Sequence, residues 1–242
     1  MANTLVYTLD GKIYINLTNH CTNDCIFCLR NDKDDVCGQT LWLDDENSTA
    51  KDVIEQLEAV KQLSSQAAKL DNSKILQEQL TDKNSSTLQP FNPSTDSSLP
   101  SEVIFCGYGE PMLKFDVLKE VAKYIKENYP DTKIRVNTNG HANFVEKRNV
   151  VPELKGLVDE FSVSLNGATK EEYDEYSRPK FDEAYDEMKK FIKACSDEGI
   201  SVVASVVDGY KGRHLDLEKC EKIASDLGAK FRVREWIPAG YS

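Results

Sequence analysis

Short apolar segments alternate along this chain with longer amphipathic ones, and this alternation constrains the fold more than any other feature. Six of the apolar segments have the length and composition of β-strands: 12–17, 102–106, 133–137, 161–165, 200–207 and 230–236. Strands that alternate with helices pair in parallel through right-handed crossovers. The sequence therefore predicts an α/β fold. The alternation alone leaves open whether the sheet is doubly wound or curves as a barrel.

One polar stretch interrupts the alternation. Residues 64–100 are rich in Ser, Asn, Gln, Asp and Thr, and the second half of this stretch has no apolar period. Such a composition buries too little apolar surface to offset the entropy of ordering. We expect a single domain over residues 1–242, with 64–100 as a mobile insertion between the first helix and the second strand.

The overall charge and cysteine usage exclude several classes of protein. A net charge of −11 argues against a nucleic-acid partner or an anionic membrane, because phosphate binding needs a basic surface. No run approaches the roughly twenty apolar residues of a membrane span, and the N-terminus lacks the pattern of a signal peptide. Seven cysteines, an odd number, suit a reducing compartment. We therefore expect a cytoplasmic protein.

Three thiols follow the first strand at a C-x3-C-x2-C spacing: Cys21, Cys25 and Cys28. The carboxyl ends of parallel strands are where ligands bind, and thiolates grouped this tightly typically bind metal. Three thiolates suit a four-iron cluster with one iron open to a chelating molecule. The alternative is structural zinc with His20 or Cys37 as the fourth ligand. This stretch alone leaves both open.

Unusual residues also follow the next three strands. Gly107-Tyr108-Gly109-Glu110-Pro111 comes after the second, Thr138-Asn139-Gly140 after the third and Asn166-Gly167 after the fourth. Turn chemistry accounts for each set taken singly. Because all of these ends meet at the same edge of a parallel sheet, the four sets together predict one binding site.

The residue types suit an amino acid that chelates the open iron. Backbone at Gly107 and Gly109, together with the carboxylate of Glu110, can hold an amine. Ser164 and Arg178 can hold a carboxylate, the arginine by a two-point fork. The remaining candidates are Asn137, Thr138 and Asn166, which suit a ribose, and Phe27, whose ring suits a purine.

At these residues the chain resembles the radical S-adenosylmethionine (radical SAM) superfamily. Cys21-x3-Cys25-x-Phe27-Cys28 is similar to its signature, Gly107–Pro111 to its Gly-Gly-Glu motif, and Ser162–Gly167 to its Ser-Leu-Asp-Gly, with Asn166 in place of Asp. Ser177-Arg178-Pro179 resembles the segment whose Arg meets the methionine carboxylate. The resemblance implies a partial (β/α)6 TIM-like barrel and a [4Fe–4S] cluster that cleaves S-adenosylmethionine to a 5′-deoxyadenosyl radical, which abstracts hydrogen from an unidentified substrate.

The segment 16–25 most resembles the TatD-linked subgroup of that superfamily. This resemblance implies association with a TatD-type hydrolase and an electron donor such as a flavodoxin or ferredoxin. Two alternatives stay open: an activase of glycyl-radical enzymes and, outside the enzymes, a zinc-stabilised α/β binding or regulatory module. Of the other residues, we expect Cys106, Cys195 and Cys220 in the core and His141 on a surface loop.

Overall fold

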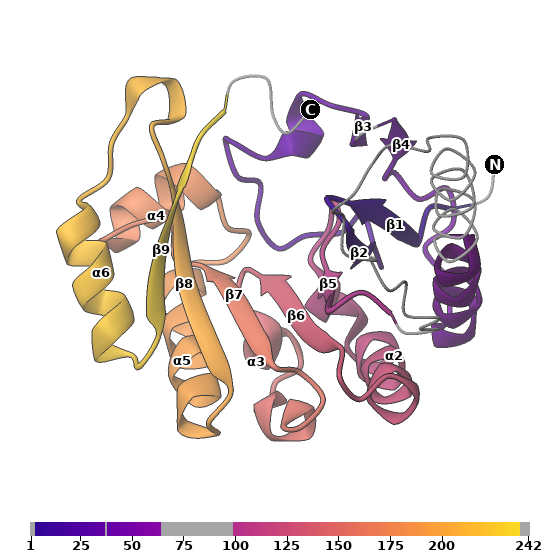
Figure 1. Ribbon diagram of the computed structural model, residues 1–242. Coiled ribbons are helices and arrows are strands. Elements are labelled where there is room, and N and C mark those ends of the chain that lie inside the picture. The colour runs from indigo at the N-terminus through magenta and orange to yellow at the C-terminus, as the bar shows by residue number, and fades with distance from the viewer. Residues whose placement is uncertain (1–2, 37, 64–98, 238–242) are drawn as a thin grey trace, which may run out of the picture.

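The computed structural model describes residues 3–36, 38–63 and 99–237. At its centre lies a seven-stranded sheet with the order β1-β2-β5-β6-β7-β8-β9 (Figure 1). These strands are β1 (Val6–Leu9), β2 (Lys12–Ile15), β5 (Glu102–Phe105), β6 (Lys133–Thr138), β7 (Glu160–Ser164), β8 (Ser201–Asp208) and β9 (Lys230–Glu235). All neighbours from β2 to β9 pair in parallel, so the six predicted strands and their parallel arrangement are confirmed.

The first strand of the sheet escaped the sequence prediction. β1 pairs antiparallel with β2 through a turn at Asp10-Gly11, where both residues have positive φ. An Asp-Gly pair between two alternating segments is a strong hairpin signal. Two further short strands, β3 (Asp35–Val36) and β4 (Gln39–Thr40), form a separate ribbon. Most of the predicted insertion, 64–98, and Cys37 lie outside the described residues.

Helices connect the parallel strands. Residues 50–63 are helical, and the later helices are α2 (Phe115–Asn128), α3 (Ala142–Val145), α4 (Lys170–Ser177), α5 (Ala184–Asp197) and α6 (Leu217–Asp226). Pro179 lies between α4 and α5. Residues Val151–Leu154 form a 3-10 turn. Within the residues that the structure describes, none of the helices combines the length and apolar character needed to cross a lipid bilayer.

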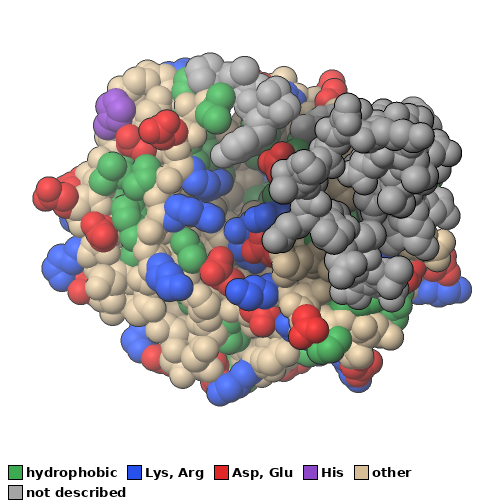
Figure 2. Space-filling view, viewed as in Figure 1, with side chains coloured by type: hydrophobic (Ala, Val, Ile, Leu, Met, Phe, Trp, Pro, Cys, Tyr) green, Lys and Arg blue, Asp and Glu red, His purple; other side chains and the backbone are tan. Residues whose placement is uncertain are grey.

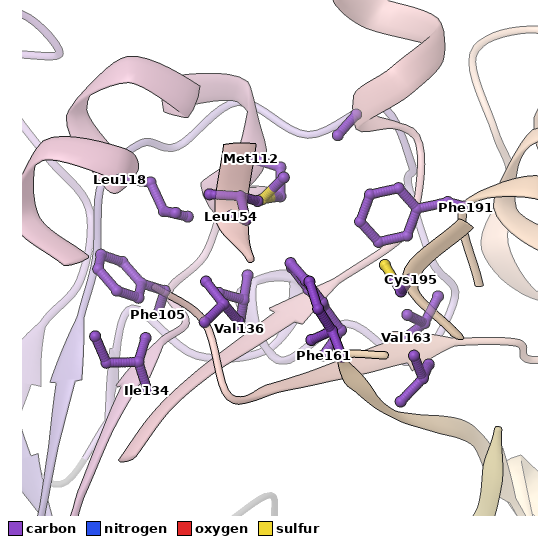
Figure 3. Close-up of a cluster of buried hydrophobic side chains, with 14 of the residues drawn as sticks. Phe105, Met112, Leu118, Ile134, Val136, Leu154, Phe161, Val163, Phe191 and Cys195 are labelled. Atoms are coloured by element: carbon purple, nitrogen blue, oxygen red, sulfur yellow. The ribbon is translucent and has the colours of Figure 1, made fainter. Parts of the chain in front are cut away.

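The main core lies between the sheet and the helices behind it (Figures 1 and 3). Alternate strand residues such as Val136 and Phe161 point toward helix residues such as Leu118 and Phe191, and all four are fully buried. Burial of such side chains contributes about 1.5–3 kcal/mol each. The core placement of Cys195 and Cys220 is confirmed. The prediction for Cys106 is wrong: this residue follows β5, is only partly buried, and alternates away from the core residue Phe105.

Candidate active site

The loop that carries the three thiols, residues 20–28, is bound to the end of α4 by backbone hydrogen bonds. The amide of Asp24 donates to the carbonyl of Ser177 at 3.0 Å, and the amide of Ile26 donates to that of Tyr176, also at 3.0 Å. Lys180 N donates back to the carbonyl of Thr22. α4 and the residues after it therefore fix the path of the thiol loop.

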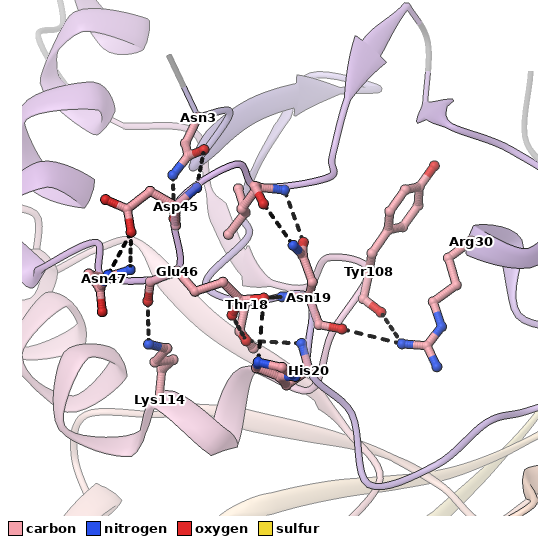
Figure 4. Close-up of polar contacts among 11 residues, drawn as sticks. Asn3, Thr18, Asn19, His20, Arg30, Asp45, Glu46, Asn47, Tyr108 and Lys114 are labelled. Carbon is pink, nitrogen blue, oxygen red and sulfur yellow. Dashed lines mark hydrogen bonds and ion pairs between the residues drawn. The ribbon is translucent and has the colours of Figure 1, made fainter. Parts of the chain in front are cut away.

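The segment that leads into this loop is held from the other side (Figure 4). The side-chain amide of Asn19 exchanges two hydrogen bonds with the backbone of Leu43, at 2.9 and 3.0 Å. Glu46 accepts from the backbone amide of Asn19 and from the hydroxyl of Thr18. The ring of His20 lies 3.8 Å from Glu46, and 78% of its side chain is exposed. His20 is thus engaged with Glu46 at the surface rather than enclosed with the thiols.

Cys21, Cys25 and Cys28 are free thiols of intermediate exposure. Among the described residues, no three His, Cys, Asp or Glu side chains gather closely enough to hold a single metal ion. A four-iron cluster binds each thiolate through a different iron. The three thiols on this fixed loop would supply three such ligands and leave one iron open.

Burial makes these thiols reluctant to ionise. It raises the pKa of Cys21 to about 11 and that of Cys25 to about 12. Arg30 opposes this effect at all three thiols, because its positive charge favours the thiolate form and lowers each pKa. Iron binding would remove the thiol protons, and the nearby guanidinium favours that change.

Arg30 also ties the thiol loop to the loop after β5. With 14% of its side chain exposed, its guanidinium donates to the carbonyl oxygens of Asn19 and Tyr108 (Figure 4). It also donates to the carbonyl of Asn23 and pairs with Asp24. No sequence pattern points to Arg30, because a single arginine shortly after the last thiol belongs to no motif.

The two glycines after β5 let that loop dock against residues 16–20. A Cβ on Gly109 would lie 2.2 Å from the carbonyl oxygen of Thr18, and one on Gly107 would lie 1.9 Å from Oδ1 of Asn16. The next amide, that of Glu110, donates to the carbonyl of His20 at 2.8 Å. The glycines are therefore required by contacts within the protein, whatever they also do for a ligand.

Glu110 is buried at the junction of two strand ends. It accepts hydrogen bonds from the hydroxyl of Thr138 and the amide of Asn139, both at 2.7 Å, and from the amide of Met112 at 3.1 Å. Burial raises its pKa to about 7 despite these donors. The structure thus brings Glu110 and Thr138 together, as two of the predicted site residues, and the Thr138 hydroxyl is committed to Glu110.

A buried polar network lies beneath the thiol loop. The ring of His141 contacts Thr22 Oγ1 through Nδ1 and Tyr173 Oη through Nε2, both at 2.9 Å. Asn139 donates to Thr22 at 2.7 Å and approaches Sγ of Cys21 at 3.7 Å. The expected surface position of His141 is wrong: the residue is 1% exposed, and burial lowers its pKa to about 4. The sequence around His141 does not indicate its burial, because its partner Tyr173 lies on α4, far away in the chain.

The other predicted site residues are distributed around this loop. Phe27 packs against Tyr176 and Tyr210, with ring centroids 6.3 Å apart in each case. Asn166, at φ 49°, donates to Ser177 at 3.3 Å. Its Oδ1, like that of Asn137, is buried without a hydrogen-bond partner among the described residues. Ser164 ends β7 and is partly buried.

Arg178 is exposed and caps α4 in the left-handed conformation, with φ 45°. It lines a cavity of about 310 Å³ together with Ile26, Asn31, Glu175, Tyr210, Lys211 and Arg213. Because Ile26 lies between two of the thiols, this cavity opens beside the thiol loop. The carboxyl ends of the strands thus hold thiols, a buried carboxylate and an exposed guanidinium in one region.

Comparison with known proteins gives a consistent result. The family model described as "Radical SAM superfamily" matches residues 98–227. A radical SAM methyltransferase from Sphaerobacter thermophilus is similar in structure (TM-score 0.53, 13% identity, 95% of this chain and 68% of that chain). Streptococcus suis SuiB bound to its precursor peptide SuiA is also similar (TM-score 0.55, 16% identity, 98% of this chain and 42% of that chain). So is Kitasatospora setae TsrM, a methyltransferase with cobalamin and a [4Fe–4S] cluster bound (TM-score 0.50, 11% identity, 92% of this chain and 36% of that chain). No curated protein matches. The chain spans less than half the length of SuiB and TsrM.

Proposed function

The chain belongs to the radical SAM superfamily, and from this membership we propose that it cleaves S-adenosylmethionine reductively at a [4Fe–4S] cluster held by Cys21, Cys25 and Cys28. It is an enzyme of that class, whose members use this cluster and this cofactor. When bound, the cluster supplies the electron that yields a 5′-deoxyadenosyl radical, which abstracts hydrogen from the substrate. The observation that carries the proposal is the thiol loop itself, fixed between α4 and the loop after β5.

The chain's own residues would bind and orient the cofactor. Backbone at Gly107 and Gly109 and the carboxylate of Glu110 would hold its amine, since a carboxylate retains acceptor capacity beyond three donors. The unpartnered Oδ1 atoms of Asn137 and Asn166 would accept from ribose hydroxyls. Thr138 contributes indirectly, because its hydroxyl orients Glu110.

Ser164 and Arg178 would hold the carboxylate, and Phe27 would stand beside the purine. Arg178 supports this assignment because its side chain is exposed beside the thiol loop and no described carboxylate pairs with it. A guanidinium with free donors can bind a carboxylate through two parallel hydrogen bonds.

Finer assignments follow from the resemblance of residues 16–25 to the TatD-linked subgroup. We propose association with a TatD-type hydrolase, electron delivery by a flavodoxin or ferredoxin, and a partial (β/α)6 barrel that encloses the site. An activase of glycyl-radical enzymes is the second candidate within the same class. The zinc-stabilised module has less support. His20, one of the two candidates for the fourth zinc ligand, has 78% of its side chain exposed and lies 3.8 Å from Glu46.

Product analysis tests the proposed reaction. Anaerobically reconstituted protein, given dithionite and S-adenosylmethionine, should form 5′-deoxyadenosine and methionine. Cys25→Ala should form neither, whereas Cys195→Ala, which changes a core thiol, should retain both products. Cleavage at the wild-type rate in Cys25→Ala would contradict the assignment of the cluster to this loop.

A further inference from the structure

One face of the sheet, which we call the inner face, is turned away from the helices and carries polar side chains from β6, β7 and β9. Along β6, Ile134 and Val136 are in the core, so Arg135 and Asn137 lie on the inner face. β7 repeats this pattern with Ser162 and Ser164 opposite its buried Phe161 and Val163. A buried or partly buried arginine destabilises the folded state unless its charge has a partner.

Two more arginines join this face from β9. The parallel register pairs Ser205 with Arg232 and Val207 with Arg234, and paired residues share a face. The guanidinium of Arg232 donates to Ser162 Oγ at 2.7 Å, across the intervening β8. Arg135, Arg232 and Arg234 are hereafter called the inner arginines.

Two of the inner arginines, Arg135 and Arg232, have their charge only partly balanced. Arg135 lies 3.6 Å from Glu102, and that carboxylate also pairs with Lys12 at 2.7 Å. No described carboxylate lies within ion-pair distance of Arg232, whose hydrogen-bond partner is the neutral Ser162. Figure 2 shows Lys and Arg side chains near the middle of this view of the molecule, with Asp and Glu side chains among them. In a chain of net charge −11, three arginines on one face of the sheet are a local concentration of positive charge.

Two buried cationic donors on this face make no hydrogen bond among the described residues: Nε of Arg135 and Nε of Arg232. Nε of Arg135 lies 3.6 Å from the carboxylate of Glu102, so it has a partner for its charge, whereas Nε of Arg232 has none. Buried polar atoms in folded proteins are almost always hydrogen-bonded, so Nε of Arg232 indicates a missing partner, and a donor of this kind suits an oxyanion.

Two of the inner arginines, Arg135 and Arg234, influence the same thiol, that of Cys106. Burial raises the pKa of the Cys106 thiol at the end of β5, and Arg135 and Arg234 both lower it. Arg234 belongs to β9, which three strands separate from β5 in the sheet order. The charges of β6 and β9 therefore converge over the inner face, near the strand end that leads into Glu110.

We propose that the inner arginines bind an oxyanion of the substrate, a carboxylate or a phosphate. The inference rests on the proposed function, because it makes this face, next to the strand ends that hold the thiol loop and Glu110, the place where the substrate is anchored. Arginine binds both kinds of anion by a planar two-point fork, so the shared chemistry is the oxyanion. A substrate held here by its charged group would present its neutral part to the strand ends.

Titration calorimetry tests the proposal on reconstituted, S-adenosylmethionine-loaded protein at constant ionic strength, with inorganic phosphate and succinate as probes. We expect the wild type to bind at least one of them. Arg232→Gln should weaken that binding about tenfold or more, the effect of losing a charge-assisted hydrogen bond. Arg148→Gln, an exposed arginine paired with Glu153, should change it less than about twofold. Tighter binding of phosphate would indicate a phosphorylated substrate, and tighter binding of succinate would indicate a carboxylate.

The contrary outcomes are distinct. Wild-type protein that binds neither probe, or equal binding by Arg232→Gln, overturns the proposal. So does binding that Arg178→Gln abolishes and Arg232→Gln preserves, because the anion would then occupy the cavity beside Ile26. If Arg232→Gln fails to fold or to take up iron, Arg234→Gln replaces it under the same expectation. A parallel titration with S-adenosylmethionine separates the two claims, since failure to bind the cofactor counts against the proposed function alone.

Discussion

At the scale of single residues, Glu110 faces two opposing demands. The proposed contact with an amine needs a charged carboxylate, whereas burial raises its pKa to about 7 and favours the neutral form. Three protein donors partly compensate for burial by hydrogen-bonding its oxygens. The charge of this side chain therefore changes near neutral pH, which gives the proposed contact a pH dependence.

We predict that affinity for S-adenosylmethionine falls as the pH is lowered from about 8 to about 6, through the pKa of Glu110 at about 7. A protonated carboxyl cannot offer a charged acceptor, so the bound amine loses that contact. Glu110→Gln should bind about tenfold to a hundredfold more weakly at pH 8, with a flatter pH profile. Anaerobic calorimetry measures both, and a profile shared by wild type and variant would contradict the role of Glu110.

His141 predicts a pH effect on stability. Its folded pKa is lowered to about 4 from 6.5, so below pH 6.5 the unfolded chain takes up a proton that the folded chain refuses. Stability from this residue is therefore lost between pH 6.5 and about 4, by up to about 3 kcal/mol. Glu110 acts in the opposite direction, because its raised pKa favours the folded state as the pH falls toward 4.5.

A His141 variant separates the effect of His141 on stability from that of Glu110. The difference in apparent unfolding free energy between wild type and His141→Gln should shrink as the pH falls from 6.5 to 4.5. The matched difference for Val145→Ala, an exposed residue without a titratable group, should stay nearly constant. Anaerobic denaturation at fixed ionic strength measures both. A His141 difference that stays constant would show that the buried ring is not held neutral.

At the scale of elements, the loop after β5 and the thiol loop depend on each other through two glycines. A Cβ on Gly109 would meet backbone at 2.2 Å, and backbone cannot move without parting the two loops. At Gly107 the Cβ would meet the buried side chain of Asn16, which could adjust only by giving up its hydrogen bond to the carbonyl of Leu41. We predict that Gly109→Ala impairs iron uptake and costs more than about 3 kcal/mol of stability, while Gly107→Ala costs about 1–3. Iron analysis and thermal melting test the order; equal effects would contradict the docking argument.

The element scale also shows what the sequence could predict. The six parallel strands and the grouping of the thiols with Glu110 follow from periodicity and from motif positions at strand ends. Arg30, Thr22 and His141 could not be predicted, because their partners lie on segments distant in the chain. The grouping of the inner arginines could not be predicted either. β9 alternates charged with apolar residues, and an exposed edge strand has the same pattern.

The whole molecule combines a net charge of −11 with three arginines on the inner face and a thiol loop at the carboxyl ends of the strands. The chain covers 68% of the methyltransferase and 42% of SuiB, so the likeness concerns the shared fold and not what those proteins act upon. The central claim is that three thiolates, and no fourth protein ligand, hold a [4Fe–4S] cluster. A fourth thiolate would close the iron at which S-adenosylmethionine is proposed to bind.

The measurement that tests this claim most directly is electron paramagnetic resonance of the reduced, anaerobically reconstituted protein, supported by iron and sulfide analysis. We predict about four irons and four sulfides per chain and a [4Fe–4S] signal that changes when S-adenosylmethionine is added. Cys37→Ala should keep both properties, and Cys25→Ala should lose the cluster. Stoichiometric zinc without sulfide, together with loss of metal in Cys37→Ala, would contradict the account, because a structural zinc site needs its fourth protein ligand.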